Sequence, residues 1–209
     1  MNHKKISIIF TTLMLPLIVL AYLFLDLPVG KWAIAHDNTT LFHVSEFISL
    51  FGEATYPLII SALLWLFWRF YKKNAHLASQ AGFFFLSIVI TGVSANIIKA
   101  IFGKARPILL KNEDDFGFKW FVLPNDYDHH SFPSGHTTTA FTIATALSLI
   151  FPKWWPAFYA YAITVGFARI GAWDHYPSDV LAGALYGTVL TLMLFHWKKI
   201  SFKNQQAST

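Results

Sequence analysis

Apolar runs alternate with short polar stretches along the chain, and six of these runs approach the length of a membrane-spanning helix. The hydrocarbon core of a bilayer requires about 20 consecutive, mostly apolar residues in a helix. We therefore predict an all-α, polytopic membrane protein with about six transmembrane helices. The predicted spans are residues 6–27, 56–70, 81–102, 137–151, 157–172 and 180–197. The fourth run has the weakest hydropathy, because it contains a cluster of threonines.

Two stretches between these runs have a different character. Residues 28–55 (PVGKWAIAHDNTTLFHVSEFISLFGEAT) mix apolar and polar side chains, which predicts an amphipathic segment lying along the membrane interface. Residues 103–133 form a long connection rich in charged and aromatic side chains, which is typical of a functional or disordered loop. The sequence contains no linker, repeat or low-complexity tract, so residues 1–209 are predicted to form a single membrane domain. We expect the first run to be a span rather than a cleaved signal peptide, because it is longer than a typical signal core.

The composition agrees with a membrane protein and excludes several other classes. Hydrophobic residues make up 55% of the chain and charged residues 13%, which lies outside the balance of soluble domains. The chain contains no cysteine, which excludes disulfides, thiolate nucleophiles and cysteine-bound metals. Its net charge of +5 does not indicate nucleic-acid binding, because Lys and Arg sit at the ends of apolar runs instead of on one face.

The basic residues also predict how the protein is oriented. If the N-terminus lies in the cytoplasm, nine of the 16 Lys and Arg fall on the cytoplasmic side, in agreement with the positive-inside rule. These nine are Lys4, Lys5, Arg69, Lys72, Lys73, Lys153, Lys198, Lys199 and Lys203. Both termini are then cytoplasmic, and all 11 acidic residues face the outer side.

Three polar clusters stand at the predicted outer ends of the apolar runs. Ionisable groups near a membrane are energetically costly and commonly mark functional sites. The clusters are KAIFGKARP (99–107), PSGH (133–136) and RIGAWDHYPSD (169–179). Because all three fall on the same side of the membrane, we expect them to form one site.

The first cluster supplies two cations. Lys99 and Arg106 are seven residues apart, so on a continuous helix they would share a face and reach one anion. Gly103 and Pro107 are expected to end the helix, and the proline favours an extended conformation at Arg106. Taken alone, each cation also fits an ordinary contact with lipid headgroups. The headgroup interpretation is kept for Lys104, Lys111 and Lys119.

The second cluster predicts the start of a helix. Ser134 or Gly135 is expected to be the N-cap of the apolar run that follows His136. The unpaired amides and the partial positive charge of a helix N-terminus attract anions, and glycine lets the backbone approach a ligand closely. The alternative is a capped helix with a solvent-facing histidine. His129 and His130 are assigned to the loop, because their spacing does not support a metal site.

The third cluster pairs a histidine with a carboxylate. His175 and Asp179 are four residues apart, and Pro177 suits the first turn of the last helix. A carboxylate at this spacing can hold one imidazole nitrogen, which makes the other a competent nucleophile or base. Arg169 can present its planar fork to phosphate oxygens. The alternative is an interfacial salt bridge among Arg169, Asp174 and Asp179.

Together the clusters resemble the type 2 phosphatidic acid phosphatase family, whose signature has three parts, K-x6-RP, PSGH and SR-x5-H-x3-D. The order and the spacings agree over residues 99–179, and the six-helix plan extends the resemblance over most of the chain. The matching residues are Lys99, Arg106, Pro107, Pro133, Ser134, Gly135, His136, Arg169, His175 and Asp179. One departure is Ala168, which stands where the family often has the serine that supports a phosphate hydrogen bond.

The resemblance implies a role for each matching residue. His175 would attack phosphorus and form a phosphohistidine, with Asp179 orienting it. His136 would protonate the leaving oxygen and later activate water. The phosphoryl oxygens would be held by Lys99, Arg106, Arg169 and the backbone around Ser134 and Gly135. The resemblance implies no metal and no other cofactor, because cationic side chains would neutralise the phosphoryl charge.

The expected activity is hydrolysis of a terminal phosphate from a lipid, at the outer face of a bacterial inner (plasma) membrane. Undecaprenyl pyrophosphate and phosphatidylglycerol phosphate rank first as substrates, ahead of phosphatidic acid and lipid A phosphate. A phosphotransferase acting between two lipids would share the first half of the reaction. Vanadium haloperoxidases share the residue pattern but are soluble, and an inactive lipid-binding or transport protein would not need both histidines. The expected partners are the lipid phosphate and membrane lipids, and the oligomeric state stays open.

Overall fold

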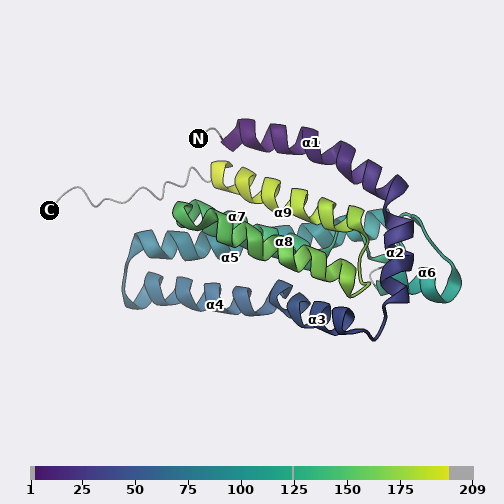
Figure 1. Ribbon diagram of the computed structural model, residues 1–209. Helices are drawn as coiled ribbons and strands as arrows, with labels where there is room; N and C mark the ends of the chain where they lie inside the picture. The colour runs from purple at the N-terminus through teal and green to yellow at the C-terminus, as the bar shows by residue number, and fades with distance from the viewer. Residues whose placement is uncertain (1–2, 124, 198–209) are drawn as a thin grey trace.

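The computed structural model describes residues 3–123 and 125–197 as a bundle of helices that lie side by side (Figure 1). The predicted all-α, membrane-embedded class is confirmed. The long helices are α1 (His3–Phe24), α4 (Thr55–Leu66), α5 (Ala75–Phe102), α7 (Gly135–Ile150), α8 (Trp155–Gly171) and α9 (Pro177–Trp197). The shorter elements are α2 (Asp26–Ala35), α3 (Thr40–Ser49), η1 (Leu50–Gly52), η2 (Phe67–Tyr71), α6 (Pro107–Glu113), η3 (Tyr127–His129) and η4 (Pro152–Trp154).

Within the described residues, four stretches are long and apolar enough to cross a membrane. They are Lys4–Phe24, Thr40–Tyr71, Ala75–Phe102 and Pro177–Trp197. The helices α7 and α8, with 16 and 17 residues, are shorter but run alongside these four in the bundle (Figure 1). The predicted number of six spans therefore stays a prediction.

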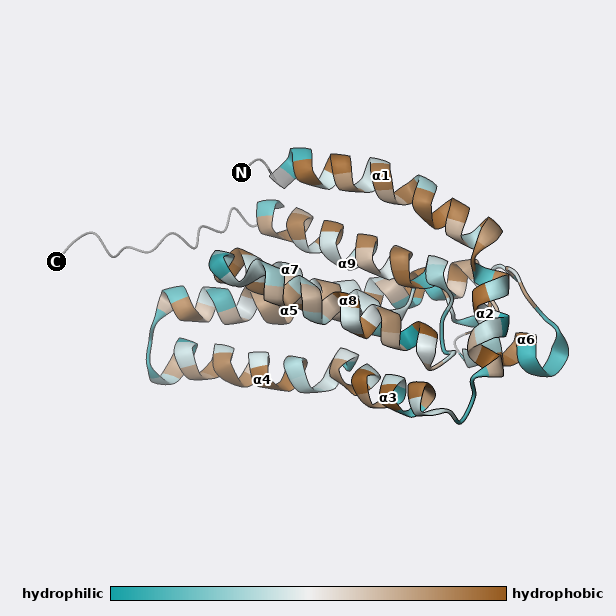
Figure 2. Ribbon diagram, in the orientation of Figure 1, coloured by the Kyte–Doolittle hydropathy of each residue, from teal (hydrophilic) through white to brown (hydrophobic). Residues whose placement is uncertain are grey.

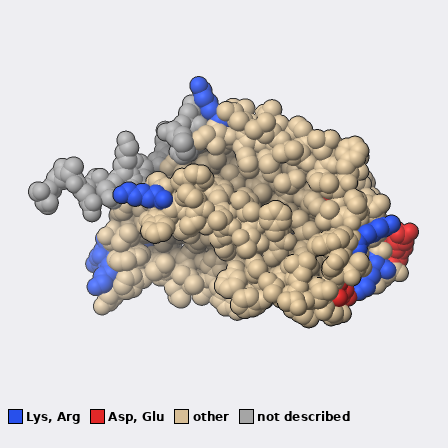
Figure 3. Space-filling view, in the orientation of Figure 1, with Lys and Arg blue, Asp and Glu red and all other residues tan. Residues whose placement is uncertain are grey.

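The outer surface of the bundle is apolar along its length. Hydrophobic residues line α1, α4 and α9, whereas hydrophilic residues gather at α6 and at the turn between α4 and α5 (Figure 2). On the face shown in Figure 3, charged side chains lie near the two ends of the molecule, and the acidic ones lie at one end only. This distribution matches a protein that contacts lipid along its sides and water at its ends.

The predicted interfacial segment 28–55 divides into two parts that differ. The helix α2 runs across one end of the bundle, while α3 continues toward α4 and packs against α8 (Figure 1). The helix α3 lies in the apolar stretch Thr40–Tyr71. It buries Ser45 and Ser49 inside the protein and exposes His43 and Glu46, so the interfacial position of this segment stays a prediction.

The helix α7 lies at the centre of the bundle, where it contacts α5, α8 and α9. The threonines that weakened its hydropathy are buried, and most of their hydroxyls form hydrogen bonds inside the protein. Thr138 donates to the carbonyl of Ser134 at 2.8 Å and Thr142 donates to Thr91 Oγ1 at 3.1 Å. The weak hydropathy of α7 therefore follows from its central position, because the helices around α7 contact the lipid in its place.

Two glycines of α9 allow this helix to approach α7 closely. A Cβ atom added at Gly183 would lie 2.8 Å from the carbonyl oxygen of Ser134, and one at Gly187 would lie 2.5 Å from that of Thr138. Both distances are too short for a side chain, so the two backbones are in direct contact here. Close packing through small residues is common between membrane helices.

The connection 103–133 folds over one end of the bundle. Gly103 ends α5, as predicted, in the left-handed conformation with φ of 55°, and Pro107 starts the short helix α6, which was not predicted. Backbone hydrogen bonds join Lys119 N to the carbonyl of Gly103 at 2.9 Å and Ser131 N to that of Lys104 at 3.0 Å. The returning chain therefore covers the end of α5 and leads directly into α7.

Candidate active site

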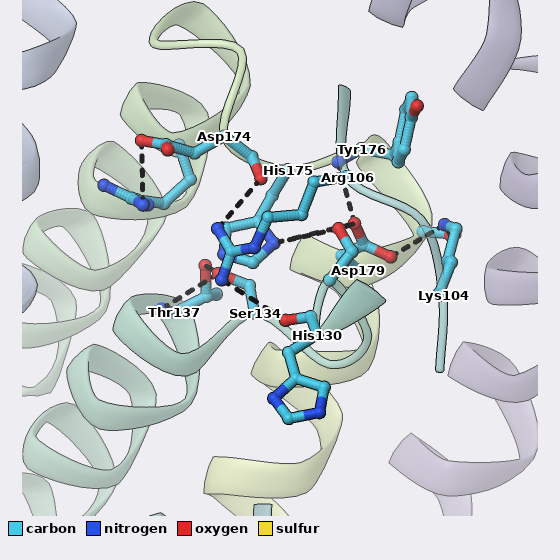
Figure 4. A network of polar contacts seen from close by, with 12 residues as sticks. Lys104, Arg106, His130, Ser134, Thr137, Asp174, His175, Tyr176 and Asp179 are labelled. Atoms are coloured by element: carbon cyan, nitrogen blue, oxygen red, sulfur yellow. Dashed lines mark hydrogen bonds and ion pairs between the residues drawn. The ribbon is translucent and has the colours of Figure 1, made fainter. Parts of the chain in front are cut away.

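The three predicted clusters meet at the end of the bundle where α5 ends and where α7 and α9 begin (Figure 4). Arg106 of the first cluster donates to the carbonyl of Asp174 in the third cluster at 3.4 Å. The amide of Ser134 in the second cluster donates to the carbonyl of Asp179 at 3.0 Å. Segments far apart in the sequence therefore form one polar site.

His175 and Asp179 lie in the most enclosed part of this site. The His175 side chain is 1% exposed, and its Nδ1 atom lies 3.6 Å from Asp179 Oδ2. Ser131 lies between them, with its hydroxyl 2.6 Å from Asp179 Oδ2 and 3.4 Å from His175 Nδ1. Sequence reasoning missed Ser131. A hydroxyl two residues before the PSGH motif was the available signal.

The surroundings of His175 favour the neutral form of its ring. Burial lowers the pKa of the imidazole well below its usual value of 6.5, and the hydrogen bond with Asp179 offsets only part of this effect. The nearby cations Arg106, Lys99 and Arg169 lower the pKa of His175 further. A neutral imidazole keeps a free lone pair on one nitrogen, which is the form that can act as a nucleophile or base.

Lys99 and Arg106 converge on one backbone oxygen, the carbonyl of His130. Lys99 Nζ donates to it at 2.7 Å, and Arg106 Nη2 donates to it at 3.3 Å. Arg106 has the predicted extended conformation, with φ of −82° and ψ of 162°, and its guanidinium stacks 4.0 Å from the centre of the Tyr127 ring. The two cations approach each other although Lys99 lies in α5 and Arg106 lies beyond its end.

The start of α7 faces the same cations. Ser134 is the N-cap, as predicted, and its side-chain oxygen accepts a hydrogen bond from the amide of Thr137 at 3.4 Å. A Cβ atom added at Gly135 would lie 3.8 Å from Lys99 Cε, so the first turn of the helix approaches the Lys99 side chain. The positive end of the helix dipole therefore adds to the charge of the side chains.

His136 contacts an acidic residue that sequence reasoning did not select. Its Nε2 atom lies 2.9 Å from Glu53 Oε1, with side-chain exposures of 26% and 44%. Glu53 lies at the break between η1 and α4, next to Gly52. A Cβ atom at Gly52 would lie 2.9 Å from His136 Cβ, so this glycine lets the break approach the histidine. His136 is thus only partly exposed and paired, in contrast to the solvent-facing alternative.

Arg169 forms an ion pair with Asp174, with Nη2 2.8 Å from Oδ2. Its Nε atom is buried and has no hydrogen-bond partner among the described residues. The alternative salt bridge among Arg169, Asp174 and Asp179 is wrong for Asp179. That carboxylate pairs instead with Lys104 Nζ at 2.7 Å.

The headgroup interpretation of Lys104 is wrong. Its side chain is fully buried, whereas a headgroup contact requires exposure. Lys111 and Lys119 do lie at the surface, where they pair with Asp37 at 2.8 Å and with Asp126 at 3.5 Å. In the described residues, no group of three His, Asp or Glu side chains has an arrangement suited to a metal ion.

Comparison with known proteins agrees with this geometry. A model of the PAP2 superfamily matches residues 80–203, more than half of the chain. The chain therefore belongs to the PAP2 superfamily, and the resemblance seen in the three motifs is confirmed. This membership, with the apolar helices, makes the protein an integral membrane lipid phosphatase.

Particular relatives cover most of the chain. It is 33% identical to lipid A 1-phosphatase of Rhizobium johnstonii, over 89% of this chain and 80% of the relative. It is 30% identical to undecaprenyl-diphosphatase of Sulfolobus acidocaldarius, over 74% of this chain and 69% of the relative.

Two solved structures have the same fold. The crystal structure of LpxE from Aquifex aeolicus matches with a TM-score of 0.59 and 26% identity, over 82% of this chain and 95% of that chain. The crystal structure of a transmembrane PAP2 type phosphatidylglycerolphosphate phosphatase from Bacillus subtilis matches with a TM-score of 0.60 and 20% identity, over 95% of this chain and 98% of that chain. The second likeness concerns the fold alone.

Proposed function

We propose that this protein hydrolyses the terminal phosphate of a lipid phosphate or diphosphate through a phosphohistidine at His175. The observation that carries the proposal is the enclosed contact of His175 Nδ1 with Asp179 and Ser131. A contact at Nδ1 leaves Nε2 as the nitrogen that can attack phosphorus. The buried, neutral state of the ring favours this attack.

In the first step, His175 Nε2 forms a bond to phosphorus while the bond from phosphorus to the lipid oxygen breaks. His136 donates a proton to that leaving oxygen, so the lipid departs as an alcohol or as a lipid monophosphate. In the second step, His136 accepts a proton from water, and the hydroxide attacks the phosphohistidine. Inorganic phosphate leaves, and both histidines return to their starting states.

The phosphoryl oxygens would be held by three cations and by the first amides of α7. Lys99 and Arg106 already converge on one carbonyl oxygen, and Arg169 Nε has no other acceptor among the described residues. Phosphoryl transfer depends mainly on positioning and on neutralising the oxygens. Three fixed cations and a helix N-terminus suit this task, so we propose catalysis that requires no metal ion.

Glu53 would hold His136 in its catalytic orientation. The distance of 2.9 Å between Glu53 Oε1 and His136 Nε2 is that of a charge-assisted hydrogen bond. A neighbouring carboxylate favours the protonated imidazole, which is the form that donates to the leaving oxygen. Burial and the nearby cations Arg169, Arg106 and Lys99 lower the pKa of His136 to about 3, so the role proposed for Glu53 is to oppose this effect.

The relatives change the ranking of the candidate substrates. Undecaprenyl pyrophosphate and phosphatidylglycerol phosphate rank first from the sequence. Lipid A 1-phosphate joins them, because relatives named lipid A 1-phosphatase match most of this chain. We propose a single domain in a bacterial inner membrane, with both termini cytoplasmic and the site on the outer side. On the face shown in Figure 3, the acidic residues gather at one end, which supports this orientation.

The test is phosphate release by the purified protein in detergent, with these three lipids and phosphatidic acid as substrates and EDTA present. His175→Ala should abolish turnover. His129→Ala, which removes a loop histidine paired with Asp126, is the control and should be active. Quenching in alkaline detergent with ³²P-labelled lipid should trap label on the wild-type protein and not on His175→Ala, and acid should release this label, because the P–N bond of phosphohistidine is labile in acid. Near-normal turnover of His175→Ala, or a strict requirement for a divalent ion, would refute the proposal.

A second lipid as phosphate acceptor distinguishes hydrolase from phosphotransferase. If the enzyme is a hydrolase, the label appears as inorganic phosphate whether or not an acceptor lipid is supplied. Label transferred mainly to the acceptor lipid would assign the second half of the reaction to a transferase and would leave the phosphohistidine step unchanged.

A further inference from the structure

A cluster of buried charges lies behind Asp179, on the side away from His175 (Figure 4). It consists of Asp26 at the start of α2, Lys104 in the connection after α5, and Ser178 and Asp179 at the start of α9. The side chains of Asp26, Lys104 and Asp179 are all 0% exposed. Burying three charges is costly unless they pair, so this cluster calls for an explanation.

Lys104 uses each of its three ammonium protons within the cluster. Its Nζ atom donates to Asp26 Oδ2 at 2.6 Å, to Asp179 Oδ1 at 2.7 Å and to Ser178 Oγ at 2.8 Å. The ammonium group also lies 4.7 Å from the centre of the Tyr176 ring and 5.3 Å from that of Tyr22. These rings close off the cluster and add cation–π attraction.

Both carboxylate oxygens of Asp26 also accept hydrogen bonds within the cluster. Its Oδ1 atom accepts from the amide of Ser178 at 2.9 Å, and its Oδ2 atom accepts from Ser178 Oγ at 2.6 Å as well as from Lys104. Asp26 therefore connects the end of α1 and the start of α2 to the first turn of α9, where Asp179 lies.

The cluster fixes which way the Asp179 carboxylate points. Oδ1 is taken by Lys104, while Oδ2 faces Ser131 Oγ at 2.6 Å, the Tyr176 amide at 2.9 Å and His175 Nδ1 at 3.6 Å. Rotation of the carboxylate would break a contact on each side. The contact of Lys104 with Oδ1 therefore fixes the orientation of Oδ2, the oxygen that faces His175.

The net charge of the cluster also complements the charge that the His175 ring acquires during the reaction. Asp179 and Lys104 alone would cancel, so Asp179 would offer little stabilisation to a positively charged ring. Asp26 adds a second negative charge, which leaves the cluster of two carboxylates and one ammonium with a net charge of −1. That value matches the single positive charge that the His175 ring acquires when its second nitrogen bonds to phosphorus.

We propose that Asp26 and Lys104 are positioning residues for the His175–Asp179 pair, which they orient and keep at a net charge of −1. This inference rests on the proposed function of His175. Asp26 lies outside residues 80–203, where the family model matches, and the three-part signature leaves the position of Lys104 unspecified. Neither residue is expected to touch the substrate.

Charge balance predicts a non-additive result for a pair of substitutions. Asp26→Asn brings the cluster to 0 and Lys104→Met brings it to −2, and each should lower kcat by about 30-fold or more, as for loss of a buried charge partner. The double variant Asp26→Asn with Lys104→Met returns the cluster to −1. Its kcat should exceed that of Asp26→Asn by about 3-fold or more, whereas a purely structural role predicts a further loss. KM should change by less than about 3-fold throughout, because the phosphate contacts stay intact.

The experiment measures kcat and KM for phosphate release from a lipid phosphate by the full-length variants in detergent, with their melting temperatures. Asp37→Asn is the matched control, because Asp37 accepts from Lys111 Nζ at 2.8 Å outside the cluster, and it should leave kcat unchanged. If a single variant fails to fold, kcat of the wild type is compared instead with that of the charge-balanced double variant and with that of Asp26→Glu, which keeps the charge. Asp26→Glu should keep kcat within about 10-fold of wild type.

Two failures are distinguishable. A wild-type protein that releases no phosphate from any lipid overturns the proposed function itself. An active wild type with an unchanged kcat in Asp26→Asn, or a folded double variant with lower kcat than both single variants, overturns the positioning role and leaves the phosphatase activity standing.

Discussion

The contact between Glu53 and His136 allows a quantitative prediction for Glu53→Gln. This change keeps the shape of the side chain but removes the negative charge 2.9 Å from His136 Nε2. A hydrogen bond to a charged group contributes about 1.5–3 kcal/mol. The Glu53 side chain is 44% exposed, so we reduce this to about 1–2 kcal/mol for solvent screening. The expected loss in kcat on a lipid phosphate is therefore about 5- to 30-fold.

The leaving group provides the decisive assay. A lipid alkoxide needs a proton from His136 to depart, whereas p-nitrophenolate is stable as an anion and does not. Glu53→Gln should consequently lower kcat for the lipid phosphate and have little effect on p-nitrophenyl phosphate. The control is Glu46→Gln, because Glu46 forms a comparable but exposed pair with His43 at 3.6 Å in the same part of the chain. It should match wild type on both substrates.

The outcome that refutes the reasoning is specific. Equal losses on both substrates would mean that Glu53 serves folding or phosphate binding rather than proton donation by His136. Wild-type kcat on the lipid would mean that His136 needs no partner.

Three further predictions concern the pH profile, the helix packing and inhibition. Burial lowers the pKa of His175 below 6.5, so its ring loses its proton at lower pH than usual. The acid limb of kcat/KM should therefore lie below pH 6.5. An acid limb above that value contradicts this assignment. Gly187→Ala should lower the melting temperature, because its Cβ would meet the carbonyl of Thr138 at 2.5 Å, whereas Gly92→Ala, with nothing within 4 Å, should not. Orthovanadate should inhibit competitively with the lipid by occupying the phosphate site, and insensitivity in a phosphate-release assay would count against that site.

The sequence predicted those parts of the fold and site that depend on local signals. Gly103 ends α5 because glycine tolerates the left-handed conformation, and Ser134 starts α7 because its oxygen caps a free amide. The spacing of four between His175 and Asp179 kept them close in space, with His175 two residues before α9 and Asp179 in its first turn. Each of these inferences needed only residues close together in the chain.

Long-range partners could not be predicted in this way. Asp26 lies 152 positions before Ser178, which it contacts. Glu53 lies between η1 and α4 and contacts His136 of α7. Lys104 carries the same charge as its surface neighbours Lys111 and Lys119, and only the arrangement of α2 and α9 makes it buried. The amphipathic pattern of α3 was equally ambiguous, since a polar face can turn toward water or toward a protein interior.

The glycine contacts between α7 and α9 determine the alignment of these two helices. Asp179, Gly183 and Gly187 are four residues apart, so they share one side of α9, which faces Ser134 and Thr138 of α7. Sliding α9 by one helical turn, about 5.4 Å, would leave a glycine against one of the two carbonyls but would bring a side chain against the other. Only one alignment of the two helices is therefore permitted, and it is the alignment that puts the proposed nucleophile, His175, beside the first turn of α7. The distances within the proposed site are thus set by two positions at which the chain has no side chain.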